Sequence, residues 1–241
     1  MGDQETHIEH HFETAEQQRG AANLGMWVFL ATEVLFFSGL FMAYTFVRWS
    51  SPETVHAASR HLELVFGTIN TAVLLTSSLI MAIGVQFAEF GKTRLAALML
   101  AITAVMGFAF LAIKATEYTM VIHEGLFPGK NFQAERVVPG IIHQGTQLLS
   151  LPIKAGEPGT PPILAGRPGA AELFFWLYFV MTGLHALHVL IGVVMLGLLA
   201  VLLRRGTYVS NNTVHNAGLY WHFVDMVWVF LFPLLYLAGY W

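Results

Sequence analysis

Five ionisable side chains lie inside long apolar stretches of this 241-residue sequence. Glu33 falls within LGMWVFLATEVLFFSGLFMAYTF, His185 and His188 within TGLHALHVLIG, and His222 and Asp225 within LYWHFVDMVWVF. Side chains of these types can share protons, ligate a metal ion or hydrogen-bond between helices. Because an acid at the centre of a bilayer costs roughly 2.5–3.5 kcal/mol on insertion scales, each of them needs a structural or functional reason to be there.

The spacing of these residues favours one shared site. His185 and His188 are three positions apart, which places both on one face of a helix, and the same holds for the pair in the last apolar stretch. Counted along the helices expected below, most of the five lie in the same half of the bilayer. Polar groups in lipid are tolerated when they face a bundle interior and find partners. We therefore predict a buried polar network of Glu33, His185, His188, His222 and Asp225.

The same histidines allow two further interpretations. The HxxH pattern in TGLHALHVLIG can hold a metal ion, but it lacks the glutamate of HExxH, and the chain has no cysteine to complete a ligand set. Haem ligation by His188 and His222 needs only one histidine from each of two helices and stays open as an alternative. Interhelical hydrogen bonding is the simpler interpretation, so we expect no metal site in this chain.

The composition defines the class of protein that must position these groups. The chain is 56% hydrophobic and 11% charged, with a mean hydropathy of +0.60. Soluble domains are about 25% charged, so an integral membrane protein is indicated. The absence of cysteine excludes disulfides and iron–sulfur clusters, and a net charge of −3 provides no basic field for nucleic acid.

Five stretches are long enough to cross a bilayer as helices, which needs about 20 apolar residues. The sequence therefore predicts an all-α bundle of five transmembrane helices. The expected segments are a polar amino-terminal tail (1–21), three transmembrane helices (22–118), a long Gly/Pro-rich loop (119–171) and two more helices (172–241). The individual spans are expected at 22–47, 66–88, 95–118, 172–203 and 217–241.

The basic residues of the short loops predict the orientation. Cytoplasmic loops of membrane proteins carry an excess of Lys and Arg. In a five-span chain the Lys and Arg residues of the short loops all fall on one side of the membrane, so that side is expected to be cytoplasmic. The N-terminus is then in the cytoplasm, and the C-terminus and the 119–171 loop are outside. The residues concerned are Arg19, Lys92, Arg94, Arg204 and Arg205.

Two smaller patterns concern helix packing. Asn70, Ser77 and Gly84 recur every seven residues and form a small, polar stripe of the kind that packs against another helix. Lys114 and Glu117 are three positions apart and can form an ion pair that anchors the end of the third span.

Several segments together suggest a family. TEVLFFSGLFMAY, INTAVLLTSSLIMA, KATEYTM, TGLHALHVLIG and GLYWHFVDMVWVFLFPLLY occur in the order found in subunit III of the haem–copper terminal oxidases, the group of cytochrome c and quinol oxidases. The chain resembles the short five-helix form, which lacks the two leading helices of the seven-helix form. The resemblance covers about 22–120 and 171–241, essentially the whole membrane part.

The resemblance implies a non-catalytic subunit of a proton-pumping respiratory oxidase in a bacterial plasma membrane. Such a subunit carries no haem or copper of its own, because these lie in subunits I and II. It packs on subunit I, binds phospholipid and supports stability and proton uptake during oxygen reduction. The family's buried acid corresponds to Glu33, and its histidine and aspartate motifs correspond to the other four residues of the predicted network.

Further candidate contacts come from the residues themselves. Candidate lipid or interface residues are Arg204, Trp221 and Trp228, where the tryptophans suit either an interfacial belt or helix contacts. The 119–171 loop is either a contact for further respiratory-complex subunits or a tolerated insertion. Two alternatives stay open. One is the related helper subunit of nitric oxide reductases, which shares these motifs. The other is a freestanding proton-coupled carrier with Glu33 and Asp225 as a relay, which would favour discontinuous helices and an inverted repeat.

Overall fold

The computed structural model describes residues 14–129, 132–137 and 168–240, and these residues are almost entirely helical. Five of the helices are long and apolar enough to cross a membrane, which confirms the predicted five-helix fold. In chain order the elements are α1 (Ala15–Ser50), α2 (Pro52–Ser59), α3 (Leu64–Glu89), α4 (Thr93–His123), α5 (Ala134–Val137), α7 (Pro168–Arg204), α8 (Asn211–Leu235) and the 3₁₀ turn η1 (Leu237–Gly239).

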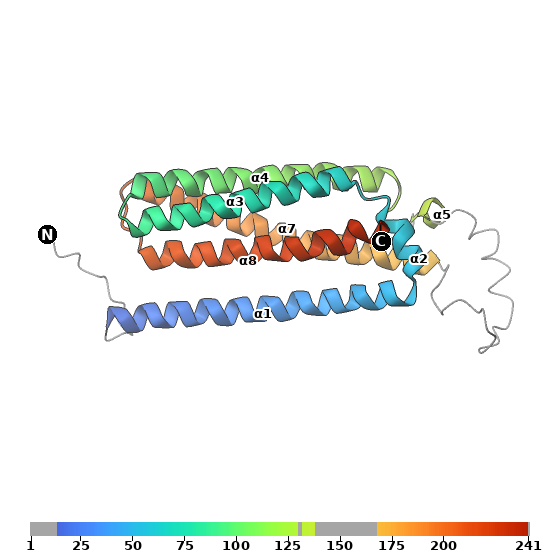
Figure 1. Cartoon of the computed structure of the whole chain (residues 1–241), viewed down its shortest axis with the longest axis horizontal. Helices are drawn as coiled ribbons and strands as arrows, with labels where there is room; N and C mark the ends of the chain where they lie inside the picture. Colours follow the sequence, from blue (N-terminus) through green and yellow to red (C-terminus); the bar gives the residue numbers. More distant parts are fainter. Residues whose placement is uncertain (1–13, 130–131, 138–167, 241) are drawn as a thin grey trace.

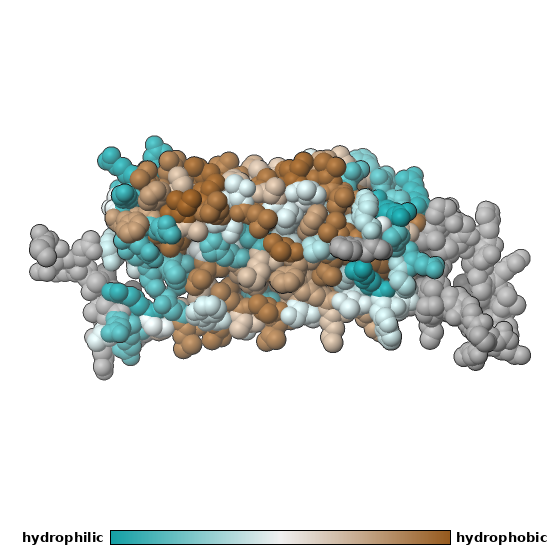
Figure 2. Space-filling model, in the orientation of Figure 1, coloured by the Kyte–Doolittle hydropathy of each residue, from teal (hydrophilic) through white to brown (hydrophobic). Residues whose placement is uncertain are grey.

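The long helices alternate in direction. Figure 1 shows α3, α4, α7 and α8 side by side in one bundle, with α1 running alongside it. The α3–α4 and α7–α8 connections lie at the end where α7 finishes, here called the Arg204 end. The short elements α2, α5 and η1 gather at the opposite end, here called the α2 end. Figure 2 shows hydrophobic residues over much of the middle and hydrophilic residues toward both ends, as a membrane-spanning bundle requires.

Seven-residue periodicity determines which side chains enter the core. A heptad repeat keeps one seam of a helix facing its neighbour and produces left-handed knobs-into-holes packing. The buried stripe of α3 is Gly67, Asn70, Leu74, Ser77, Met81, Gly84 and Ala88, so the predicted packing role of the small, polar stripe is confirmed. The buried stripe of α4 continues through Leu100, Thr103, Gly107, Phe110, Lys114, Glu117 and Val121.

Two glycines let a tryptophan enter the centre of this bundle. The indole of Trp221 on α8 is fully buried. A Cβ built on Gly107 of α4 would meet this indole at 2.5 Å, and one built on Gly192 of α7 would meet it at 2.8 Å. Real Cβ atoms do not approach so closely, so three helices meet here only because two of them lack a side chain.

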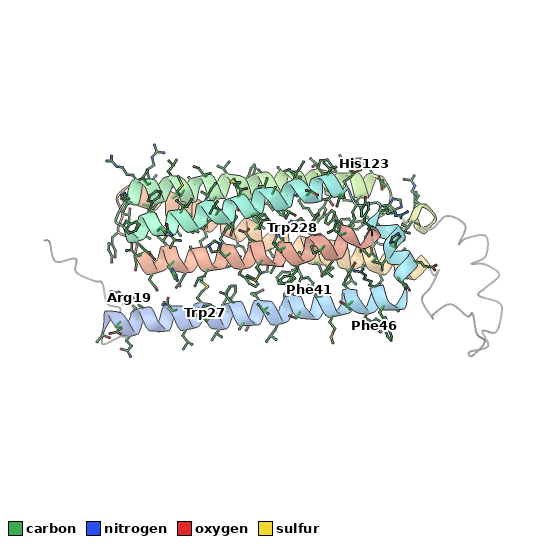
Figure 3. All side chains as sticks on the ribbon, viewed as in Figure 1. Arg19, Trp27, Phe41, Phe46, His123 and Trp228 are labelled. Atoms are coloured by element: carbon green, nitrogen blue, oxygen red, sulfur yellow. The ribbon has the colours of Figure 1, made fainter. Side chains whose placement is uncertain are left out.

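The first helix packs through a single narrow stripe. Leu30, Phe37, Tyr44 and Val47 are buried, while most of the other apolar side chains of α1 are exposed, including Trp27 and Phe46 in Figure 3. Met26, Leu40 and Phe41 pack partly buried beside this stripe. Its contacts are with α7 and α8, together with the short helix α2. Glu33 occupies the stripe position between Leu30 and Phe37, so the one acid of this span faces the bundle.

The boundaries of several segments differ from the sequence prediction. The first helix begins at Ala15, within the expected 1–21 tail, because Thr14 caps it by accepting a hydrogen bond from the Gln17 N–H at 3.1 Å. Similarly, α4 continues to His123 and α7 begins at Pro168, so both enter the expected 119–171 loop. The helices α2 and α5 were not expected, since each is too short for its periodicity to be recognised. The remaining part of that loop, 138–167, lies outside the described residues.

Candidate functional site

Glu33 and His188 face each other between α1 and α7, and they form an ion pair when the histidine is protonated. Glu33 Oε2 lies 3.2 Å from His188 Nε2, with side-chain exposures of 20% and 14%. The ring of His188 also lies edge-on to Phe37, with 5.6 Å between ring centroids, and the Tyr220 hydroxyl donates to the His188 carbonyl at 3.0 Å. The pair therefore joins α1 and α7, and the Tyr220 hydrogen bond adds α8 to the same contact.

The hydrogen bonds of His188 define where a proton must be. Nδ1 lies 2.8 Å from the Leu184 carbonyl oxygen, which can only accept, so Nδ1 carries hydrogen. Nε2 then either carries a second hydrogen and donates to the Glu33 carboxylate, or accepts from a protonated Glu33. In both forms one proton lies between the two residues. The arrangement can hold and exchange a proton at a site that is partly accessible from the surface of the chain.

His185 occupies a different environment although it is one helical turn away. Its side chain is 1% exposed and lies between Phe110 and Trp228, with ring centroids 5.5 and 5.2 Å away. Neither ring nitrogen has a hydrogen-bond partner in the part of the chain that the structure describes. The i, i+3 spacing leaves an angular offset of about 60° between the two histidines. This offset directs His185 into the core while His188 faces α1.

The two residues of the last span also lie apart from the Glu33–His188 pair. His222 Nδ1 is 2.7 Å from the Ser78 hydroxyl on α3. Asp225 is 3% exposed, and its carboxyl oxygens make no hydrogen bond of normal geometry to a described residue, but the Ser78 hydroxyl that contacts His222 is also the side chain closest to bonding this carboxyl group. The five residues predicted as one network are therefore not joined in a single hydrogen-bonded network within the described chain: Glu33 contacts His188, while His222 and Asp225 lie next to the same Ser78 hydroxyl.

A metal site was considered for the histidines of these spans, and a lipid or interface contact was expected for Arg204, Trp221 and Trp228. Among residues 14–129, 132–137 and 168–240, no three His, Asp or Glu side chains are grouped as metal ligands. Arg204 is exposed at the end of α7 and is available for a lipid or interface contact. Trp221 and Trp228 are both 0% exposed and donate to Ser77 and Thr71 on α3. The expected lipid or interface role of these two tryptophans is thus wrong, because heptad packing buries them (Trp228 in Figure 3).

A second polar cluster lies toward the α2 end and was missed as a cluster in the sequence. Lys114 and Glu117 are 2% and 1% exposed, with Nζ 3.1 Å from Oε2, so the predicted pairing is confirmed. The hydroxyls of Tyr178 on α7 and Tyr236 beyond α8 donate to Glu117 Oε1 at 2.8 and 2.5 Å. Lys114 also donates to both hydroxyls. The pair joins three elements inside the bundle and does not anchor a helix end at the membrane surface.

The signal for this cluster was present in the sequence. Lys114 and Glu117 continue the seven-residue stripe of Gly107 and Phe110, so their burial follows from the register of α4. Nothing in the local sequence indicated that the two tyrosines would supply the remaining partners.

The cytochrome c oxidase subunit III family model matches residues 170–241, which contain His185, His188, His222 and Asp225. Cytochrome c oxidase subunit 3 of Thermostichus vulcanus is 31% identical over 89% of this chain and 86% of its own length. This chain belongs to the cytochrome c oxidase subunit III family. As a subunit III, it is a component of a haem–copper oxidase complex.

Two other relatives extend the comparison. The cytochrome bo(3) ubiquinol oxidase subunit 3 of Pseudomonas aeruginosa is 25% identical to this subunit III over 96% of the chain and 92% of the relative. The haem–copper oxidase subunit I+III of Aeropyrum pernix is 27% identical over 88% of the chain but only 22% of its own length. The relatives thus include subunits named for a cytochrome c oxidase and for a ubiquinol oxidase.

Proposed function

We propose that this subunit III packs on subunit I of a proton-pumping respiratory oxidase in a bacterial plasma membrane and sustains its turnover. In this role it supports the stability, lipid binding and proton uptake of the complex, while haem and copper are held by subunits I and II. The Glu33–His188 pair is the observation that carries the proposal, because it places a proton-holding group at a partly exposed position between helices. The Aeropyrum pernix relative, named as a joined subunit I+III, supports direct packing on subunit I.

The orientation proposed from the sequence agrees with the way the helices alternate. Arg19 lies near the start of α1, and the other basic residues of the short connections fall at the same Arg204 end of the bundle (Figures 1 and 3). An excess of Lys and Arg marks the cytoplasmic side. This end is therefore proposed to face the cytoplasm, where charged groups can shape the field at a proton entrance of the catalytic subunit.

Two further contacts belong to the proposal. Arg204, exposed at the cytoplasmic end of α7, contacts lipid or a neighbouring subunit. The 119–171 segment contacts further subunits of the respiratory complex.

A depletion experiment tests this function. Complex lacking subunit III is compared with native complex in continuous oxygen-electrode traces at two pH values. We expect unchanged haem and copper spectra and a surviving initial rate. Activity should then decline progressively, and faster at alkaline pH, where protons are scarcer. Immediate and complete loss of activity with altered haem bands would show that the chain helps to build the redox site. An equal rate of decline at both pH values would contradict the proton-uptake role.

Reconstitution provides a matched control. Native subunit III added back to depleted complex should restore endurance, while Glu33→Gln should restore less at the alkaline pH because the amide cannot hold the shared proton. Val34→Ala, a change at the adjacent exposed position, should restore it fully. Full restoration by Glu33→Gln would contradict a role for the pair.

A further inference from the structure

Ser78 on α3 uses its hydroxyl differently from the threonines of the same helix. Thr68, Thr71 and Thr76 each donate to the backbone carbonyl four residues earlier, at 2.8 Å, which satisfies a hydroxyl inside a membrane helix. The Ser78 hydroxyl oxygen instead lies 2.7 Å from His222 Nδ1 on α8. Ser78 therefore links groups of two different helices.

A buried carboxyl group lies next to the same hydroxyl. Asp225 follows His222 by three positions on α8, is 3% exposed, and has Ser78 as the side chain closest to bonding it. Among residues 14–129, 132–137 and 168–240, no Lys, Arg or His nitrogen lies within 4.0 Å of its carboxyl oxygens. An ionised acid without a cation beside it is costly in hydrocarbon. Asp225 therefore carries a proton.

The Ser78 hydroxyl lies between this acid and the imidazole. Because the His222 nitrogens are more than 4.0 Å from the Asp225 oxygens, no hydrogen bond joins the two directly. A hydroxyl both accepts and donates, so Ser78 can accept from Asp225 while it donates to Nδ1 of the histidine. In that arrangement the single ring hydrogen of His222 lies on Nε2.

The histidine is the more accessible end of this line. The His222 side chain is half-buried, whereas Asp225 is buried. Within the part of the chain that the structure describes, Nε2 of His222 makes no hydrogen bond. A proton that reaches the imidazole can therefore leave to a base outside the chain.

We propose that Asp225, Ser78 and His222 form a proton-exchange site in which the Ser78 hydroxyl is the bridge. The Asp225 O–H bond breaks and its proton binds the Ser78 oxygen, while the Ser78 hydroxyl proton binds His222 Nδ1. This step forms a carboxylate and an imidazolium and leaves the hydroxyl intact. The imidazolium then gives its Nε2 proton to water or another base, and the reverse steps return a proton to Asp225.

This site is separate from the Glu33–His188 pair. It lies on α3 and α8, whereas the pair lies on α1 and α7. The inference goes beyond the proposed function, because proton exchange at Asp225 requires neither that pair nor a step of oxygen reduction.

The test uses the purified oxidase complex in lipid nanodiscs without an electron donor. Stopped-flow infrared spectroscopy follows the carbonyl band of protonated Asp225 after an upward pH jump, and Asp225→Asn identifies this band by removing it. Ser78→Ala should slow the loss of the band at least about tenfold, because transfer through a positioned group is faster than transfer between separated groups. His222→Gln should slow it similarly. Ser78→Thr keeps the hydroxyl and should keep most of the native rate.

The matched control is Thr76→Ala, which removes only a hydrogen bond to the same helix and should leave the rate unchanged. An unchanged carbonyl band in Asp225→Asn would show that Asp225 is ionised and would overturn the proposal, as would a native band that does not respond to the jump. A native rate in Ser78→Ala or His222→Gln would show another route to Asp225.

A packing role is tested by the two Ser78 variants. Equal slowing by Ser78→Ala and Ser78→Thr would show that Ser78 acts through packing and not as the bridge. Because no turnover occurs in this measurement, its failure is distinguishable from failure of the endurance experiment on the proposed function.

Discussion

The Glu33 carboxylate on α1 lies 3.2 Å from His188 Nε2 on α7, at a position where the docking stripe of α1 is otherwise mostly apolar. A second polar contact, from the Tyr44 hydroxyl to the Leu234 carbonyl, joins the same helix to the end of α8. Lipid is as apolar as Leu or Phe, so apolar contacts alone give little preference for one rotation of a membrane helix. The two polar contacts therefore select the rotation of α1.

The Glu33–His188 interaction is expected to show a measurable coupling. Glu33→Leu and His188→Leu should be less than additive, with a coupling of about 0.6 kcal/mol and at most about 1.7, as found for interhelical hydrogen bonds in membranes. A double-mutant cycle on the unfolding of the purified chain measures it. The control cycle pairs Glu33→Leu with His222→Leu, because His222 binds Ser78 instead. Equal coupling in both cycles would contradict a specific pair.

The Lys114–Glu117 cluster should be far more sensitive to loss of one partner than to loss of both. Lys114→Met leaves a buried carboxylate, and removing one partner of a buried pair costs about 3–5 kcal/mol. The double variant Lys114→Met with Glu117→Leu should recover much of this loss, although two tyrosine hydroxyls lose their acceptor. Equilibrium unfolding in detergent checks both. A double variant as unstable as the sum of the single variants would contradict the mechanism.

Gly107 should not tolerate even a methyl group. Its Cβ would lie 2.5 Å from the Trp221 indole and 2.6 Å from Val193, so Gly107→Ala should destabilise the bundle by about 1–3 kcal/mol through overpacking. A lower Tm and altered tryptophan fluorescence should accompany the change. Gly197→Ala, with open space around the new Cβ, is the matched control and should keep the native Tm.

His185 should be replaceable by an apolar residue at little cost. Both ring nitrogens are buried without a partner among the described residues, so His185→Leu removes unsatisfied polar atoms while it loses the tilted ring contact with Trp228. We expect a Tm equal to or above that of the native chain. His188→Leu, one turn away, should lower the Tm because it leaves Glu33 unpaired. A large loss from His185→Leu would show that this histidine has a hydrogen-bond partner in the membrane.

The sequence by itself determined the class of protein and its five membrane helices, because hydrophobicity over about 20 residues is a local property. It also indicated the buried face of α3, since Asn70, Ser77 and Gly84 recur every seven residues. The pairing of Lys114 with Glu117 followed from their spacing on one helix.

Only the tertiary structure decided which polar residues meet. Residues of different helices are brought together by helix rotation and relative height, and neither is encoded in the local spacing of one helix. For this reason Glu33 meets His188 but not His222, and Tyr178 and Tyr236 complete the Lys114–Glu117 cluster from distant parts of the chain. The same reason explains Trp221, whose type suggested an interface but whose position against Gly107 and Gly192 places it in the core.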